Sequence, residues 1–238
     1  MSDREVVFVR HGQSTWNREN RFTGWTDVGL SEQGVEEASS AGRVLKHAGF
    51  VFDEAHISYL RRAQETLDLV LAAMAHPPIP ICRTWLINER HYGALQGLNK
   101  TEIREKYGEA QFREWRRGYA TRPPALAPDD LRHPRFDPLW ADVPPDQLPA
   151  TESLADTRAR VERYWQETLA RRVAEGRRIL VSAHGNSMRA LLMFLEGLSE
   201  SEVVSLEIPT GQPVVYTVSA DGKPLGYRYL GSEAAVGS

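Results

Sequence analysis

Short apolar runs alternate along the chain with segments in which apolar residues recur at helical spacing. Strands are predicted at Val6–Val9, Glu54–Ser58 and Ile179–Ala183, and the first and last are runs of the kind that a parallel sheet buries on both faces. The segments 31–47, 61–74 and 151–176 carry the helical spacing. This alternation predicts an α/β fold with a mostly parallel central sheet and helices on both faces.

The helical segments also indicate which residues face the core. Ser31 is expected to cap the first helix, and Gly176 is expected to end the third. Trp165 continues the apolar stripe of the third helix, so we expect it in the core and not at a ligand. The apolar positions of the first two helices are Val35, Ala38, Val44 and Leu45, followed by Leu67, Val70, Leu71 and Met74.

The other segments are shorter or irregular. An edge strand is predicted at 79–81 around Pro80, and two short helices are expected near 101–107 and 109–117. Ser199 is expected to cap a further short helix. Segments 214–218 and 225–230, joined through Asp221 and Gly222, predict a β-hairpin.

We expect one catalytic domain over residues 1–231. Residues 118–150 contain eight of the fourteen prolines and too few apolar residues for a core of their own. They are therefore predicted to form an irregular insertion or lid. The small and polar residues 232–238 are predicted to form a mobile tail.

Composition narrows the classes of function. A net charge of −3 over 238 residues gives no general attraction to nucleic acid or membranes, and no apolar run approaches the length of a membrane span. The single cysteine, Cys82, excludes an internal disulfide and is typical of a reducing compartment. With the first strand beginning so close to Met1, no signal peptide is expected, and the sequence predicts a cytoplasmic protein. It leaves open whether the chain forms a homo-oligomer.

Two predicted strands end in the same way. Arg10-His11-Gly12 follows the first strand, and His184-Gly185 follows the strand at 179–183. Open α/β sheets bind their ligands at the carboxyl ends of the strands, so we expect both imidazoles to face one pocket. A lone Arg-His pair is more often a polar strand end without chemistry, but two such ends in one sheet favour a functional site.

These side chains suit phosphoryl transfer. The neutral imidazole of His11 can attack phosphorus and pass the group on, while Arg10 and Arg62 neutralise the phosphoryl oxygens. His184 is expected to stabilise the transferring group as an imidazolium. The amide of Asn186 and the N-terminus of the helix that follows add donors and partial positive charge.

Glu89 is the candidate general acid for the leaving oxygen, because it lies in an aperiodic segment that is dense in reactive side chains. Each assignment has a plainer alternative. Glu89 could form a salt bridge with Arg90, His91 could be an ordinary exposed histidine, and Arg116 and Arg117 could form a solvated helix end.

A metal site is the sharper alternative, since His11, His184 and Glu89 would supply two imidazoles and a carboxylate. The nearby arginines would repel a divalent cation, and no further carboxylate recurs beside the histidines. Nucleotide binding is not supported, because neither a Walker-type loop nor a glycine-rich dinucleotide fingerprint is present.

The chain resembles the histidine phosphatase superfamily and, within it, the 2,3-bisphosphoglycerate-dependent phosphoglycerate mutases. The two His-Gly strand ends alone would indicate the superfamily. The narrower resemblance depends on further segments, which run in family order from about residue 6 to 231: Asn17, Arg21–Trp25, Leu60–Ala63, Asn88–Gly93, Gly97–Lys100, Trp115–Arg117, Glu152–Leu154, Ala183–Ser187 and Ile208–Gly211.

The resemblance implies a phosphoglycerate mutase-like fold and a phosphohistidine on His11. It implies 2,3-bisphosphoglycerate as the phosphoryl donor, 3-phosphoglycerate and 2-phosphoglycerate as the substrates, and no metal. Glu89 matches the proton donor and acceptor, and His184 matches the residue that stabilises the transition state. The positions that match phosphate- and carboxylate-binding residues are Arg10, Asn17, Thr23, Gly24, Arg62, Glu89, Tyr92, Lys100, Arg116, Arg117, Gly185 and Asn186.

Three departures from the family pattern leave alternatives open. Gln13 stands where the family usually has Glu, Gly29 where an acidic residue is common, and the C-terminal tail is short and lacks lysine. The short tail and Gln13 favour hydrolysis if water reaches the phosphohistidine. The alternatives are a histidine-type phosphomonoesterase, a bisphosphoglycerate phosphatase or synthase, and a binding module for phosphorylated ligands that has no catalytic activity.

Overall fold

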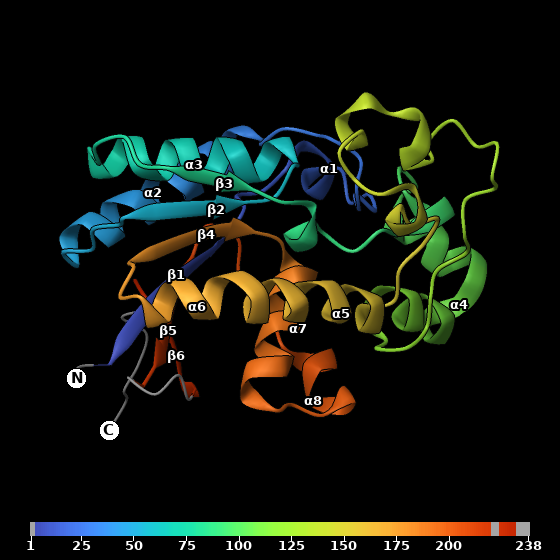
Figure 1. Ribbon diagram of the computed structural model, residues 1–238. Coiled ribbons are helices and arrows are strands. Elements are labelled where there is room, and N and C mark those ends of the chain that lie inside the picture. The colour runs from blue at the N-terminus through green and yellow to red at the C-terminus, as the bar shows by residue number, and fades with distance from the viewer. Residues whose placement is uncertain (1–2, 220–223, 232–238) are drawn as a thin grey trace, which may run out of the picture.

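A six-stranded sheet forms the centre of the fold, in the order β3-β2-β4-β1-β5-β6 (Figure 1). The computed structural model describes residues 3–219 and 224–231. The strands are β1 (Arg4–Arg10), β2 (Glu54–Ile57), β3 (Ile81–Arg83), β4 (Ile179–Ala183), β5 (Pro213–Val218) and β6 (Pro224–Tyr229). The helices are α1 (Thr15–Arg18), α2 (Glu32–His47), α3 (Arg61–Met74), α4 (Lys100–Arg117), α5 (Leu154–Tyr164), α6 (Ala170–Ala174), α7 (Gly185–Glu196) and α8 (Glu200–Ser205).

The pairing of the strands confirms the predicted α/β fold. β1, β2, β3 and β4 pair in parallel, whereas β5 and β6 add an antiparallel edge next to β1. The register of β1 and β4 pairs Arg10 with Ala183, and the backbone N–H of His11 donates to the carbonyl of Ala183 over 3.0 Å. The two histidines that follow these strands therefore lie side by side at the carboxyl ends of two central strands.

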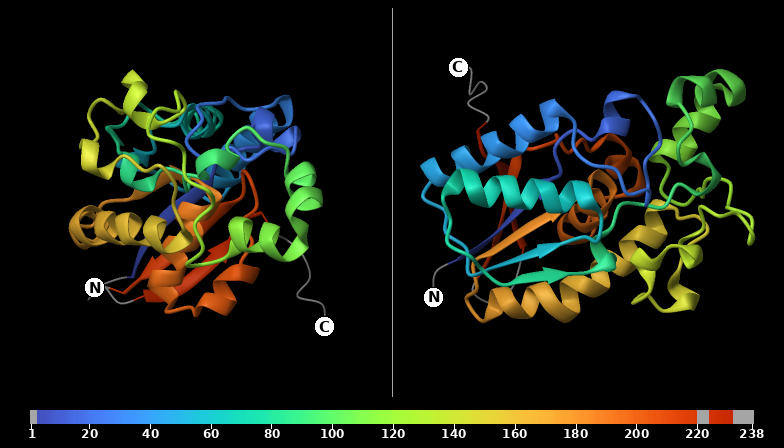
Figure 2. Two further views of the ribbon diagram at one scale, coloured as in Figure 1. Left: turned by 90° about the vertical axis from the view of Figure 1, so that its right-hand side faces the viewer. Right: turned by 90° about the horizontal axis from the view of Figure 1, so that it is seen from above.

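Helices cover both faces of the sheet (Figures 1 and 2). Successive residues of β1 point to opposite faces: Val6 and Phe8 join the cluster packed under α5 and α7, and Val7 and Val9 join the cluster packed under α2 and α3. All four side chains are at most 2% exposed. Val35, which was expected to face the core, is 43% exposed, because the buried face of α2 passes through its neighbour Gly34 and then Ala38, Ala41, Gly42 and Leu45.

The segment 154–174 is helical throughout but changes its pitch. A π-helical turn at Trp165–Leu169 joins α5 to α6. Trp165 is 7% exposed and belongs to the core, as predicted. The chain reverses at Gly176, whose φ of +84° suits a residue without a Cβ.

The element α4 and the insertion 118–150 lie together at one end of the molecule, on the right in Figure 1. The two short helices predicted near 101–117 are present within α4, and they meet at a kink at Gly108, where φ is +81° and ψ is 159°. The insertion 118–150 contains three 3-10 turns and no longer element. Its Trp140 and Val143 pack on Trp25 and Leu60, so the insertion is anchored on the segments before α2 and α3 and has no core of its own.

The C-terminal hairpin is formed by β5 and β6, as predicted, although its expected turn at Asp221 and Gly222 lies outside the described residues. The predicted tail at 232–238 also lies outside them. Ser31, Ser153 and Ser199 cap the helices α2, α5 and α8. Among the helices of the described part of the chain, none has the length and apolar character needed to cross a membrane.

Candidate active site

His11 and His184 face each other where β1 and β4 end. Their ring centroids are 5.0 Å apart, and the two residues are 3% and 0% exposed. Residue 12 must be glycine for the chain after His11 to lie against α2, because a Cβ on Gly12 would lie 2.2 Å from the carbonyl oxygen of Gly34. The predicted meeting of the two strand ends is thus formed by strand register and a close backbone contact.

The surroundings of His11 favour a neutral, nucleophilic Nε2. Its Nδ1 lies 2.7 Å from the carbonyl oxygen of Gly12, which can only accept, so Nδ1 carries the proton and Nε2 carries the lone pair. The Nε of Arg62 donates to that Nε2 over 3.3 Å. Burial, and then the charges of Arg62 and Arg10, lower the pKa of His11 well below its usual value. The imidazole is therefore neutral at physiological pH and available for attack on phosphorus.

Arg62 is fixed by the main chain around it. Its Nη2 donates to the carbonyl oxygen of Gly24 over 2.8 Å, and its Nη1 donates to that of Thr26 over 3.1 Å. Burial lowers the pKa of Arg62 to about 10, so the guanidinium stays charged at neutral pH. Gly24 has a φ of +56°, and a Cβ there would lie 2.1 Å from Oε1 of Gln96. Only glycine allows this loop to present its carbonyl to Arg62.

His184 is held on one side and unpartnered on the other. Its Nε2 lies 2.7 Å from Oγ of Ser58, while its buried Nδ1 has no hydrogen-bond partner among the described residues. Burial, followed by the charge of Arg62, lowers the pKa of His184 well below its usual value. The sequence predicts the imidazolium only while a phosphoryl group is being transferred, and this stays a prediction; burial by itself favours the neutral ring. An anion beside His184 would be needed to favour the protonated ring.

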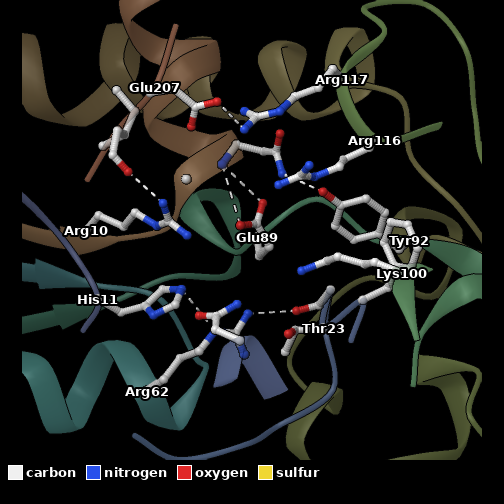
Figure 3. A pocket seen from close by; sticks show the side chains of 16 residues that line it. Arg10, His11, Thr23, Arg62, Glu89, Tyr92, Lys100, Arg116, Arg117 and Glu207 are labelled. Atoms are coloured by element: carbon white, nitrogen blue, oxygen red, sulfur yellow. Dashed lines mark hydrogen bonds and ion pairs between the residues drawn. The ribbon is translucent and has the colours of Figure 1, made fainter. Parts of the chain in front are cut away.

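A cavity of about 150 Å³ opens in front of His11 (Figure 3). Five cationic side chains and two carboxylates line it. The complete lining consists of Arg10, His11, Asn17, Phe22, Thr23, Gly24, Arg62, Glu89, Tyr92, Lys100, Arg116, Arg117, Gly185, Asn186, Glu207 and Ile208. Every residue expected from the sequence to bind phosphate or carboxylate is in this lining, and His184 lies behind it against His11.

Three residues of the lining were not expected from the sequence. Phe22 and Ile208 belong to segments that carried the family resemblance, so the signal was present there. Glu207 is a single acidic residue in a cationic site, and nothing in its sequence context distinguishes it from a surface carboxylate.

Buried polar atoms around the cavity lack partners in the described residues. They include Nε of Arg10, Oγ1 of Thr23 and Nδ1 of His184. Buried polar atoms are ordinarily hydrogen-bonded, so their gathering beside one nucleophile indicates a ligand that supplies the missing acceptors. An anion with several oxygens, such as a phosphoryl group, meets that need.

Glu89 lies opposite His11 in the cavity and is 8% exposed (Figure 3). Its Oε1 accepts from the backbone N–H of Arg90 over 2.7 Å and from that of Asn186, in the first turn of α7, over 3.2 Å. The alternative of a salt bridge with Arg90 is wrong. The guanidinium of Arg90 donates instead to the carbonyl oxygens of Trp115 and Arg116, over 2.8 and 2.7 Å.

A second cationic cluster lines the cavity away from His11 (Figure 3). It consists of Lys100 at the start of α4 and Arg116 and Arg117 at its end, so the alternative of a solvated helix end is wrong. Burial lowers the pKa of Lys100. Arg117 is paired with Glu207. Since Arg90 binds the last carbonyls of α4, it fixes the helix end that carries the two arginines.

The alternative of an exposed His91 is also wrong, because this residue is 0% exposed. Burial, and then the charge of His133, lower the pKa of His91 to about 3. Its Nδ1 accepts from the backbone N–H of Gly93 over 3.0 Å, which shapes the loop behind Glu89. Across residues 3–219 and 224–231, no group of three or more His, Cys, Asp or Glu side chains is arranged to hold a metal ion.

A buried ion pair supports the main chain of Glu89. Arg160 donates to both carboxylate oxygens of Glu152 over 2.8 and 3.0 Å, and to the carbonyl oxygens of Leu86, Asn88 and Glu89 over 2.8 to 2.9 Å. Both side chains of the pair are at most 7% exposed. The position of Glu89 therefore depends on a network that reaches back to α5.

We expect Arg160→Met to lower the free energy of unfolding by about 3–5 kcal/mol, because it leaves the Glu152 carboxylate buried without its cation. Urea denaturation followed by circular dichroism measures this. Arg158→Met is the matched control, since Arg158 pairs with Glu162 at 30% side-chain exposure and its loss should cost about 0–1 kcal/mol. Equal losses in the two variants would contradict the structural role of Arg160.

Comparisons with known proteins found a matching family model and several solved structures with a similar fold. The model of the histidine phosphatase superfamily (branch 1) matches residues 6–133 and 126–226. A mycobacterial glucosyl-3-phosphoglycerate phosphatase is 23% identical over 95% of this chain and 97% of its own, with a TM-score of 0.70. A putative alpha-ribazole-5'-phosphate phosphatase from Escherichia coli is 21% identical over 99% of each chain, with a TM-score of 0.68. A phosphoglycerate mutase from Bacillus anthracis is 20% identical over 96% of this chain and 92% of its own, with a TM-score of 0.66. At these identities the similarity to the solved structures concerns the fold.

Proposed function

The chain belongs to the histidine phosphatase superfamily (branch 1), and from this premise we propose that it interconverts 3-phosphoglycerate and 2-phosphoglycerate through a phosphohistidine on His11. Bound 2,3-bisphosphoglycerate would supply the phosphoryl group that charges His11. The side chains proposed to transfer the phosphoryl group and its proton, and to neutralise its charge, line one cavity or lie directly behind it.

The proposed transfer balances as two in-line displacements. The lone pair of His11 Nε2 attacks phosphorus, the bond from phosphorus to the ester oxygen breaks, and the protonated carboxyl of Glu89 gives its proton to that oxygen. In the return step a substrate hydroxyl attacks the same phosphorus, Glu89 takes its proton, and the N–P bond breaks. Arg10 and Arg62 neutralise the equatorial oxygens throughout.

One observation carries the choice of a mutase over a simple phosphatase. The cavity has a second cationic cluster of Lys100, Arg116 and Arg117 in addition to the arginines beside His11. A phosphomonoesterase whose substrate has no other anionic group needs cations only around the phosphoryl group that it cleaves. A phosphoglycerate has a phosphate and a carboxylate, and it can reorient within a site that binds an anion at each end.

Hydrolysis is the second candidate, because solved structures with the same fold include phosphatases and because Gln13 departs from the mutase pattern. The structure gives the Gln13 side chain a role outside the cavity. Its Oε1 accepts from Oγ of Ser31 over 2.8 Å, and its Nε2 donates to Oε1 of Gln33 over 3.2 Å. Gln13 is not part of the cavity lining, so its effect on access of water to His11 would be indirect.

The proposed function is tested by following 2-phosphoglycerate formation and free phosphate together, with 3-phosphoglycerate as substrate and with or without 2,3-bisphosphoglycerate. We expect isomerisation that depends on the bisphosphate and exceeds phosphate release. Release of phosphate without isomerisation would make the protein a phosphatase.

Removal of the second cationic cluster should weaken the binding of substrates with two anionic groups more than that of substrates with one. We expect Arg116→Ala combined with Arg117→Ala to raise the KM for 3-phosphoglycerate by about 10- to 100-fold, the effect of losing charged hydrogen bonds to one end of the ligand. Hydrolysis of p-nitrophenyl phosphate, which has one anionic group, should change less than about threefold. Arg113→Ala on the exposed side of α4 is the control. An equal loss for both substrates would contradict the assignment.

A further inference from the structure

Glu207 is a carboxylate among the cations of the cavity, and neither the nucleophile nor the proton donor uses it. It follows α8 and forms an ion pair with Arg117 (Figure 3). The side chain of Glu207 is 66% exposed, whereas that of Arg117 is 20% exposed. The pair therefore lies at the solvent side of the cavity, where a ligand enters.

The main chain around Glu207 is fixed independently of this ion pair. Its carbonyl oxygen accepts from Oη of Tyr229 over 3.1 Å. The next carbonyl oxygen, that of Ile208, accepts from Nη1 of Arg10 over 2.6 Å, and the backbone N–H of Gly211 donates to the carbonyl oxygen of Arg10 over 3.0 Å. The segment is thus tied to the strand end that carries the nucleophile, and the backbone of Glu207 stays beside the cavity whether or not Arg117 remains paired.

The charge of Glu207 acts on more than its partner. Burial lowers the pKa of Arg10, and the charges of Glu89 and Glu207 oppose that shift. Of these two carboxylates, Glu89 has the role of proton donor in the proposed mechanism. Glu207 has no partner in that chemistry, yet it accepts from Nη2 of Arg117, one of the donors that a second anionic group of the ligand would use.

We propose that Glu207 sets the affinity of the site for ligands with two anionic groups by competing with the second group for Arg117. This inference rests on the proposed function, in which Arg117 binds the far end of the ligand. The arriving anion either displaces the Glu207 carboxylate or lies beside a like charge, and both outcomes lower its affinity. A weaker hold on the far end favours product release and reorientation, while a ligand with one anion at Arg10 and Arg62 escapes the competition.

Direct binding tests this proposal. The dissociation constants of 3-phosphoglycerate and inorganic phosphate are measured by calorimetry for the wild type, Glu207→Gln, Glu207→Asp and the control Glu200→Gln, which removes an exposed charge on α8. We expect Glu207→Gln to bind 3-phosphoglycerate about three- to tenfold more tightly, with a steeper loss of affinity on adding salt. Inorganic phosphate should change less than about twofold, and the other two variants should resemble the wild type. The KM should fall with the dissociation constant, without a rise in kcat.

Three results would overturn the proposal. Unchanged or weaker binding of 3-phosphoglycerate by Glu207→Gln would mean that the carboxylate orients Arg117. Equal tightening for inorganic phosphate would mean a general charge effect. Binding of 3-phosphoglycerate no better than phosphate in both proteins would mean that no second anion site exists. Because these constants do not require turnover, a failure to isomerise 3-phosphoglycerate would count against the proposed function and leave the comparison for Glu207 intact.

Discussion

Replacing His11 with alanine is expected to abolish phosphoryl transfer, with kcat falling by at least about 10⁴-fold. The structure supplies no substitute nucleophile at that point of the cavity. The other imidazole, that of His184, lies behind the lining, and its Nε2 is engaged with Ser58. Loss of the Nε2 lone pair therefore stops both isomerisation and hydrolysis, which are measured in one coupled assay.

A matched control separates this loss from a folding defect. His47→Ala removes an imidazole at the exposed end of α2 and should leave kcat within about twofold. Unfolding curves of His11→Ala should remain cooperative, since strand pairing holds the backbone of residue 11. More than about 1% of wild-type activity in folded His11→Ala would show that His11 is not the nucleophile.

Replacing Glu89 with glutamine is expected to lower kcat for 3-phosphoglycerate by about 10²- to 10⁴-fold. The amide keeps an acceptor oxygen for the backbone N–H groups of Arg90 and Asn186 but cannot donate an acidic proton to the leaving oxygen. p-Nitrophenyl phosphate has a leaving group that departs without protonation. The rate of phosphoryl transfer from this substrate to His11 should fall by less than about tenfold, because its leaving group does not depend on a general acid.

The ratio of the two losses is the measurement that identifies the acid. Glu105→Gln, which changes an exposed carboxylate on α4, is the control for net charge and should alter neither rate. A similar loss for both leaving groups in Glu89→Gln would indicate that Glu89 positions the substrate, and another group would have to donate the proton.

Much of the fold and the site could be predicted because both depend on local chemistry and strand order. Apolar runs identified β1 and β4, and the shared His-Gly endings implied a common pocket. The parallel pairing of β1 with β4 is sufficient to place His11 beside His184. The helix caps followed for a similar reason, since a serine that accepts from the first turn acts within a few residues of chain.

Other features could not be predicted, because they depend on contacts between distant segments. The low pKa of His184 is set by burial and by the charge of Arg62 on another element, so its preference for the neutral ring could not be predicted from the sequence. Arg90 seemed available to Glu89 from their adjacency, but its guanidinium binds the end of α4. Glu207 joins the cavity through the folding of the segment after α8, and its own position carries no sequence signal, although Ile208–Gly211 directly after it does.

The contacts of the insertion 118–150 with distant segments could not be predicted from the sequence either. Its proline content indicated an irregular segment without a core, and the structure agrees. Composition did not reveal its anchor, in which the rings of Trp140 and Trp25 lie 4.7 Å apart. Trp25 in turn donates its Nε1–H to the carbonyl oxygen of Glu89 over 2.6 Å. The insertion thus stabilises the segment that carries the proposed acid.

The fate of a labelled phosphohistidine tests the central claim most directly. The protein is charged with 2,3-bisphosphoglycerate carrying ³²P, the label is mapped by mass spectrometry, and the charged protein is then mixed with 3-phosphoglycerate or with buffer alone. We predict label on His11 that passes to phosphoglycerate much faster than it reaches free phosphate. Label that leaves His11 for water at one rate, with or without 3-phosphoglycerate, would contradict the mutase and leave a phosphatase.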